Sequence, residues 1–311
     1  MPETGSVVER QSGPSVVALG GGHGLAVALR AVRLYAGSIT AIVSVADDGG
    51  SSGRLRRDLG VPAPGDLRRC LVALAADDNL WTAAFEHRFA GGELDGHALG
   101  NLMLVGLAET LGSFPDALDE AARLLGCVGR VLPACTEAVE LKAEVGPNGA
   151  DSHISTEVEG QVAVANSGNI RRVGLVPADA SPPADAISAI AAADQVVLAP
   201  GSLYTSIVPV LCVNELREAL ASTAARVVQV ANLEPQLPET AGLDATDHLA
   251  AVLDHGARVD TFLYQPGALA VDIDRIRAWG VEPVAGTMAA ANGHSHDPER
   301  LAVMLKDLLA H

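Results

Sequence analysis

The sequence is poor in aromatic residues, cysteines and long apolar runs. Aromatic residues make up 3% of the 311 residues, so the core must be built mainly from alanine, valine and leucine. The four cysteines include no C-x-x-C pair and stand in apolar surroundings, which predicts buried reduced thiols and a cytoplasmic protein rather than disulfides or a zinc site. No segment is long enough to predict membrane insertion, and the first ten residues do not predict a secretory leader.

Positive charge is also scarce. The chain has 21 lysines and arginines against 38 acidic residues, a net charge of −17. This balance opposes binding to nucleic acid or to anionic lipid. Residues 54–69 are the exception, with five arginines and only two acidic residues. The cluster predicts a small anion site, although a solvated helix face would give the same composition, and we expect Arg57 and Arg69 to lie on such a face.

Short apolar runs alternate with helical patterns, which is typical of βαβ units in a parallel sheet covered by helices on both faces. The expected strands are Ser15–Leu19, Ile39–Val45, Gln195–Leu198, Arg226–Val230, Thr261–Tyr264 and Glu282–Val284. The expected helices are Leu25–Val32, Leu67–Ala76, Leu99–Leu111, Ala184–Ala192, Asn214–Ser222, Thr246–His255, Asp272–Ala278 and Pro298–Leu309.

The middle of the chain has a different pattern. From about 129 to 176, segments of alternating polarity predict a small antiparallel β insertion, including a strand through H-I-S-T-E-V-E-G-Q-V-A-V. The sequence therefore predicts a disordered tail at 1–13 and one Rossmann-like α/β domain over 14–311, with helices on both faces of a mostly parallel sheet.

A glycine-rich loop follows the first expected strand and opens the next helix. In this position backbone amides and the helix dipole can hold a phosphate, although a tight strand-to-helix turn would look the same. The loop is not the dinucleotide fingerprint, because Leu25 and Val27 stand where that pattern needs glycine, and it lacks the G-K-[ST] of a P-loop. Its residues are Gly20, Gly21, Gly22, His23 and Gly24.

A second loop follows the next strand with two adjacent carboxylates, Asp47 and Asp48. They could accept hydrogen bonds from ribose, ligate magnesium or act as a general base, with Asp48 as one catalytic candidate. An Asp-Gly turn explains only part of this string. The residues expected to bind a ligand after the two carboxylates are Gly49, Gly50, Ser51, Ser52 and Arg54, with Gly53 as flexible backbone.

Three later segments have residues suited to a ligand. Asp66 is either the cap of the next helix or a third inward carboxylate and the other catalytic candidate. Asn101 could hydrogen-bond a base, a sugar or a loop, whereas His97 is expected to be structural. A further glycine turn after a buried strand provides backbone and hydroxyl groups and could face the first two loops across the switch point of the sheet. It contributes Gly201, Ser202, Tyr204 and Thr205.

The segment His294-Ser295-His296-Asp297 suggests a metal site at first sight. Its spacing suits neither a structural zinc site nor a helical histidine pair. Asp297 is better explained as the cap of the last helix, with Pro298 at its first position.

Taken together, the motifs cover most of the chain: G-G-G-H-G, D-D-G-G-S-S-G-R-L-R, P-A-P-G-D-L-R, F-E-H-R-F, G-H-A-L-G-N-L, A-P-G-S-L-Y-T-S-I-V-P, T-D-H and H-D-P-E. This set resembles the YvcK-like family, the gluconeogenesis factors, within the wider CofD-like superfamily. The resemblance implies a bacterial regulatory protein with no firm enzymatic activity. It would bind a UDP-sugar such as UDP-glucose or UDP-N-acetylglucosamine, and link carbon metabolism to cell-wall synthesis and cell shape.

The other branch of the superfamily implies an alternative. Its members transfer a phospholactyl-type group from a guanosine-diphosphate donor to a deazaflavin alcohol with magnesium. A flat acceptor needs an aromatic-lined slot, and three Tyr, four Phe and two Trp supply little material for one. The resemblance thus implies no required cofactor, with magnesium at Asp47 and Asp48 as an option. The expected partners are a nucleotide-sugar, a second copy of the chain and a cell-wall regulatory protein.

The resemblance also adds ligand-binding residues in the second half of the chain: Asn232, Gln236, Glu239, Thr240 and Arg275. Two positions depart from the family pattern. His23 stands where a threonine is usual, which removes a hydroxyl contact to phosphate. Leu243 stands where an aromatic residue would stack on uracil, and the segment 232–240 retains only part of its motif.

Overall fold

The computed structural model describes residues 13–76, 79–146 and 155–310, so the tail expected at 1–13 lies, except for Gly13, outside the described residues. Seven strands form one sheet in the order β10-β9-β8-β7-β1-β2-β3, and every neighbouring pair is parallel. Their bounds are β1 Ser15–Gly20, β2 Ser38–Val43, β3 Arg130–Pro133, β7 Gln195–Leu198, β8 Arg226–Val230, β9 Thr261–Tyr264 and β10 Glu282–Ala285.

The order of the strands places a switch point in the middle of the sheet. The chain builds outward from β1 through β2 to β3, then returns to pair β7 with the other edge of β1 and continues to β10. Open α/β sheets bind ligands at such a point, outside the carboxyl ends of the strands. β1 and β7, which pair at the switch point, are mostly apolar and buried, as expected for strands covered on both faces.

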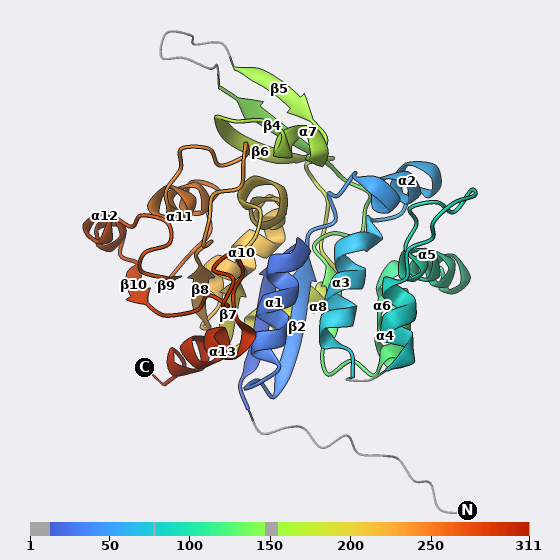
Figure 1. Cartoon of the computed structure of the whole chain (residues 1–311), viewed down its shortest axis with the longest axis horizontal. Coiled ribbons are helices and arrows are strands. Elements are labelled where there is room, and N and C mark those ends of the chain that lie inside the picture. Colours follow the sequence, from blue (N-terminus) through green and yellow to red (C-terminus); the bar gives the residue numbers. More distant parts are fainter. Residues whose placement is uncertain (1–12, 77–78, 147–154, 311) are drawn as a thin grey trace, which may run out of the picture.

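Helices cover both faces of this sheet (Figure 1). α1 packs against α3 and α13 on one face, α8 and α10 contact each other on the other, and α4 and α5 add a layer against α3. The bounds are α1 Gly22–Val32, α2 Gly50–Leu59, α3 Pro64–Leu74, α4 Leu80–Glu86, α5 Leu99–Leu111, α6 Phe114–Leu125, α7 Gln161–Ala165, α8 Ala184–Ala191, the π-helical turn η1 Leu203–Ile207, α9 Val208–Leu211, α10 Asn214–Ser222, α11 Ala245–Asp254, α12 Ile273–Ala278 and α13 Pro298–Asp307.

A separate antiparallel sheet, ordered β5-β4-β6, lies beside α2 and α7 at one end of the molecule (Figure 1). It consists of β4 Glu140–Val145, β5 Thr156–Glu159 and β6 Ile170–Val176. The predicted α/β fold with a small antiparallel sheet is therefore confirmed. The predicted insertion begins too early, however, because β3 pairs in parallel with β2 and belongs to the main sheet.

The expected strand through residues 161–164 is wrong, because these residues form α7. Gly160 has a φ of 92°, which ends β5, and the Asp48 carboxylate accepts a hydrogen bond from the Val162 amide at 2.9 Å. A contact with a residue 114 positions away therefore stabilises the start of this short helix.

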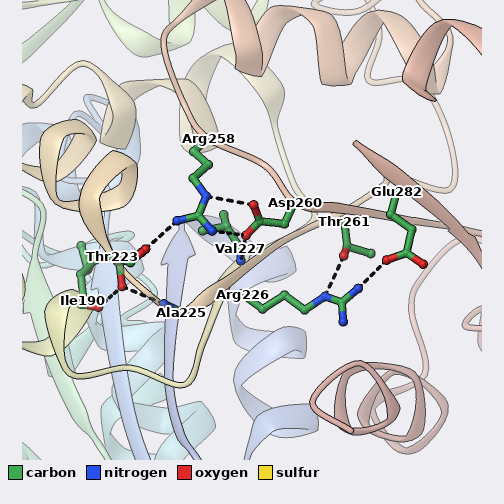
Figure 2. A network of polar contacts seen from close by, with 9 residues as sticks. All are labelled: Ile190, Thr223, Ala225, Arg226, Val227, Arg258, Asp260, Thr261 and Glu282. Carbon is green, nitrogen blue, oxygen red and sulfur yellow. Dashed lines mark hydrogen bonds and ion pairs between the residues drawn. The ribbon is translucent and has the colours of Figure 1, made fainter. Parts of the chain in front are cut away.

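Opposite the switch point, two arginines fasten the amino ends of the strands (Figure 2). Arg258 donates two hydrogen bonds to Asp260 at 2.9 Å, and Asp260 accepts a third from the Val227 amide. Arg226 donates to Thr261 and pairs with Glu282, which joins β8 to β9 and β10. These contacts join the amino ends of β8, β9 and β10. The loops of the site lie at the opposite side of the sheet, at the carboxyl ends of strands.

The predicted free thiols are confirmed, although Cys127 and Cys212 are only partly buried. All four cysteines are free, and burial raises the pKa of Cys127 and of Cys135 to about 12, so these thiols stay protonated and unreactive. None of the helices in the described residues has the length and apolar character needed to cross a membrane.

Candidate functional site

A cavity of about 520 Å³ lies beyond the carboxyl ends of β1, β2 and β7, at the switch point of the sheet. Three of the loops expected from the sequence converge on it, together with side chains from α3, α5, α7 and the segment after α4. The lining residues are Gly21, Gly22, His23, Gly24, Asp47, Gly49, Gly50, Ser51, Ser52, Gly65, Asp66, Arg68, Arg69, Arg88, Asn101, Gln161, Ala165, Gly201, Ser202, Thr205, Ser206 and Gln236.

The first glycine loop presents the amino end of α1 to the cavity. Gly21 is the N-cap, and no side chain of its own caps the helix. Gly22 has a φ of 62°, which favours glycine, and a Cβ on Gly24 would lie 1.8 Å from the Pro200 carbonyl oxygen. The glycines therefore let the loop after β1 pack directly against the loop after β7, which closes one wall of the cavity.

The second loop starts a helix where flexible backbone was expected. Residues 50–59 form α2, whose N-cap Gly49 also has no side-chain cap. The sequence obscures this helix because Gly50, Ser51, Ser52 and Gly53 have poor helix propensity. The cavity thus receives the amino ends of two helices, α1 and α2, and both present backbone amides and a positive dipole end.

The adjacent carboxylates of this loop point to different places. Asp47 lines the cavity and accepts a hydrogen bond from the Gly49 amide at 2.9 Å. Burial raises its pKa, and the nearby Asp66 carboxylate raises it further, against the lowering effect of the Gly49 amide. Asp48 is not among the lining residues, because its carboxylate is bound to the start of α7.

Three arginines supply the positive charge of the cavity: Arg68, Arg69 and Arg88. The sequence predicts Arg69 on a solvated helix face. In the structure its side chain is only 32% exposed and pairs with Asp66 at 2.5 Å. Arg54, the arginine expected in the site, instead donates to the Asp95 carbonyl at 2.6 Å and does not line the cavity. Arg88 belongs to the F-E-H-R-F string, so a signal for it was present in the sequence.

A buried chain of hydrogen bonds lies behind these groups. Arg68 Nε donates to the side-chain oxygen Oδ1 of Asn101 at 3.1 Å, and the side-chain nitrogen Nδ2 of Asn101 donates to Ser51 Oγ at 3.1 Å. Ser51 Oγ lies 3.0 Å from His97 Nδ1. Burial lowers the pKa of His97, with a further contribution from Arg54. The chain orients Arg68, Asn101 and Ser51 along one wall, and His97 has the structural role expected for it.

The third loop is held by residues that the resemblance assigned to ligand binding. Glu239 is 3% exposed and accepts hydrogen bonds from Ser202 Oγ at 2.7 Å and from the Tyr204 amide at 2.6 Å. Asn232 pairs with both backbone groups of Gly201 at 2.8 Å. Neither lines the cavity, so in this structure both position the turn that does.

The remaining predicted residues lie outside the cavity. Tyr204 is buried in η1, Thr240 bonds the Gln236 backbone, and Gly20 ends β1. Arg275 pairs with Asp247 at 3.1 Å and lies 4.9 Å above the Trp279 ring on α12. Asp66 is not the cap of α3, whose N-cap is Ala63. Sequence reasoning missed the lining residues Gly65, Arg88, Gln161, Ala165 and Ser206, did not single out Arg68 within the arginine cluster, and misplaced Arg69.

A second cavity of about 250 Å³ adjoins the first and shares His23, Gly24, Gly201 and Gln236 with it. His294 and Glu234 pair at its rim. His296, also among its lining residues, is 8% exposed, and burial lowers its pKa to about 4. Nowhere in the described residues do three or more His, Cys, Asp or Glu side chains gather as a metal site.

The buried neutral His296 makes stability depend on pH. Its pKa is depressed from 6.5 to about 4, so the unfolded chain takes up the proton first as the pH falls, and stability is lost below pH 6.5. We expect His296 to account for about 2 kcal/mol of the unfolding free energy lost between pH 7 and pH 5. Urea unfolding of wild type and His296→Asn at both pH values checks this, and equal losses in the two proteins would contradict it.

Comparisons with known proteins show the family of this chain. The family model described as "2-phospho-L-lactate transferase CofD" matches residues 16–296. A Bacillus subtilis protein named "Gluconeogenesis factor" is 36% identical over 95% of this chain and 98% of its own length. A protein of the same name from Halalkalibacterium halodurans is 44% identical over 78% of this chain and 73% of its own.

This chain belongs to the gluconeogenesis-factor family of the CofD-like superfamily. A solved structure from Bacillus halodurans, described as a UPF0052 family member, superposes with a TM-score of 0.89 at 37% identity, covering 94% of this chain and 98% of the other. At this identity and coverage, the likeness extends over nearly the whole α/β fold of this chain.

Proposed function

We propose that this gluconeogenesis factor is a cytoplasmic regulatory protein that binds a UDP-sugar, such as UDP-glucose or UDP-N-acetylglucosamine, and links carbon metabolism to cell-wall synthesis and cell shape. The observation that supports this most is the convergence on one cavity at the switch point of three arginines and the amino ends of α1 and α2, whose glycine N-caps have no capping side chain of their own. Such a site is suited to a diphosphate. The signal would then pass to a cell-wall regulatory protein or to a second copy of the chain.

The dimensions and charge of the site fit this ligand. Cavities of about 300–1,000 Å³ hold drug-sized molecules, and the cavity at the switch point, of about 520 Å³, shares lining residues with a neighbouring one of about 250 Å³. The three lining arginines exceed the two lining carboxylates, although the chain as a whole is strongly acidic. Gln236 lines both cavities, and its side-chain oxygen has no hydrogen-bond partner among the described residues, which makes its amide group suited to the sugar.

Arg69 is the arginine best placed to test this function, because it is partly exposed within the cavity. We expect Arg69→Met to weaken UDP-glucose binding by about 10- to 100-fold, since an arginine–phosphate contact contributes about 1.5–3 kcal/mol. Isothermal titration calorimetry measures the change. Arg57→Met removes the same charge from an exposed position outside the cavity and should alter affinity less than about twofold.

Two results would count against the proposal. If wild-type protein gives no heat with millimolar UDP-glucose or UDP-N-acetylglucosamine, the nucleotide-sugar function fails. If the two arginine variants lose affinity equally, the diphosphate is not in this cavity.

A magnesium-assisted transferase remains the second candidate, because Asp47 and Asp66 both line the cavity. Asp47 would hold a magnesium ion through water, which would offset charge on a diphosphate, and Asp66, once released from Gly22 and Arg69, would be the general base. Asp48 is not suited to be the general base, since its carboxylate accepts a hydrogen bond from the Val162 amide at the start of α7. Incubation with a guanosine-diphosphate donor and a deazaflavin alcohol tests this activity, with Asp66→Asn as the inactive control.

A further inference from the structure

The carboxylate of Asp66 occupies the donors that a phosphate would use. Its Oδ2 accepts a hydrogen bond from the Gly22 amide at 2.6 Å, at the amino end of α1. Its Oδ1 accepts one from Arg69 at 2.5 Å. Asp66 itself is 5% exposed and lines the cavity between these two groups.

The position of Asp66 comes from the fold rather than from capping of its own helix. Asp66 is the third residue of α3, 44 positions from Gly22, and it lies so close to α1 that a Cβ on Gly21 would be 2.8 Å from Oδ2. An amide at a helix amino end and a guanidinium are the two donors that recur in phosphate sites. The side chain therefore makes, within the protein, the contacts expected of a bound anion.

We propose that Asp66 is a built-in competitor of the ligand's phosphate and selects diphosphates over single phosphates. An incoming anion must displace the carboxylate from Gly22 and Arg69. A single phosphate gains little by this exchange, because it replaces one anion with another at the same donors. A diphosphate carries a second anionic group, which Arg88 and the α2 amino end can bind at the same time.

Asp47 offers a matched control, because it is the other carboxylate of the cavity and its partner is different. It accepts from the Gly49 amide at the start of α2 and has no contact with Gly22 among its hydrogen bonds. Removing either charge makes the cavity more positive. Only removal of Asp66 frees the Gly22 amide and Arg69 together.

This inference rests on the proposed function, and the experiment separates the two. Calorimetric titrations with UDP-glucose and with inorganic phosphate are compared for wild type, Asp66→Asn, Asp66→Ala and Asp47→Asn, with thermal unfolding to confirm that each variant is folded. We expect both Asp66 variants to bind inorganic phosphate about tenfold more tightly than wild type, and to gain less for UDP-glucose. Asp47→Asn should gain about twofold.

Each other outcome has a definite meaning. If wild type binds UDP-glucose and the Asp66 variants bind it or phosphate more weakly, Asp66 is a ligand-binding group and the inference is overturned while the function stands. Equal gains in the Asp66 and Asp47 variants would show a general charge effect and also overturn it. If no variant binds either compound, the proposed function fails together with the inference.

Discussion

Gly24→Ala is expected to lower the unfolding free energy by about 3 kcal/mol or more and to abolish UDP-glucose binding. A Cβ at this position would lie 1.8 Å from the Pro200 carbonyl oxygen and 3.0 Å from Gly201 Cα. Both are backbone atoms, so no side-chain rotation can relieve the overlap. The loops after β1 and β7 must separate, and this separation opens the wall of the cavity. Urea unfolding and calorimetry measure the two effects.

Gly106→Ala is the matched control for this substitution. Gly106 lies inside α5, and a Cβ there would meet nothing within 4 Å. The substitution should therefore stabilise the protein by about 0.5–1 kcal/mol through helix propensity and leave binding unchanged. A Gly24→Ala protein as stable as wild type would show that the two loops do not make the close contact on which the cavity depends.

Glu239→Ala is expected to lower the unfolding free energy by about 3–5 kcal/mol, because it leaves several buried donors without an acceptor. The donors are Ser202 Oγ, the Tyr204 amide and, at 3.4 Å, Thr205 Oγ1. Ser202 and Thr205 line the cavity, so nucleotide-sugar affinity should fall as well. Chemical unfolding and calorimetry follow both changes.

Two further variants serve as comparisons for Glu239→Ala. Glu239→Gln keeps one acceptor and removes the buried charge whose pKa burial raises, so it should cost less than Glu239→Ala. Glu234→Ala removes an exposed acid from the same segment and should change stability by less than about 0.5 kcal/mol. If Glu239→Ala keeps full stability but loses binding, Glu239 contacts the ligand directly, as the resemblance implied.

The parallel sheet could be predicted from sequence because its strands are apolar runs bounded by turns. Predicted and observed bounds coincide for Gln195–Leu198, Arg226–Val230 and Thr261–Tyr264. The strand Arg130–Pro133 could not be assigned to the sheet, because four residues give no periodicity and its partner, β2, lies about ninety residues earlier. The short helix α7 could not be predicted from the local sequence either, because its start is stabilised by Asp48, which lies 114 positions away from Val162.

The loops of the site could be predicted because glycine after a buried strand has a local physical cause. The direction of each long side chain could not, since it depends on neighbours far along the chain. Arg54 is bound by the Asp95 carbonyl and Asp48 by the Val162 amide, while Arg69 and Asp66 turn into the cavity. The arginine cluster thus predicted a small anion site, but the sequence did not show which of its arginines line the cavity.

The structure shows where His23 and Leu243, the two residues that depart from the family pattern, lie relative to the cavities. His23 is exposed on the first turn of α1 and lines both cavities, so an imidazole replaces the expected hydroxyl where the two cavities meet. Leu243 is partly buried and packs against the core, and it belongs to neither cavity lining. A side chain other than Leu243 would therefore have to stack on the base of the proposed ligand.

The most direct test is a crystal structure of the protein soaked with UDP-glucose. Our account places the diphosphate against the amides at the start of α1 and within hydrogen-bond distance of Arg69 or Arg88, with the Asp66 carboxylate displaced from Gly22. A diphosphate bound elsewhere, for example beside Arg275 on α12, would contradict it, and so would an Asp66 still bonded to Gly22 beneath the ligand.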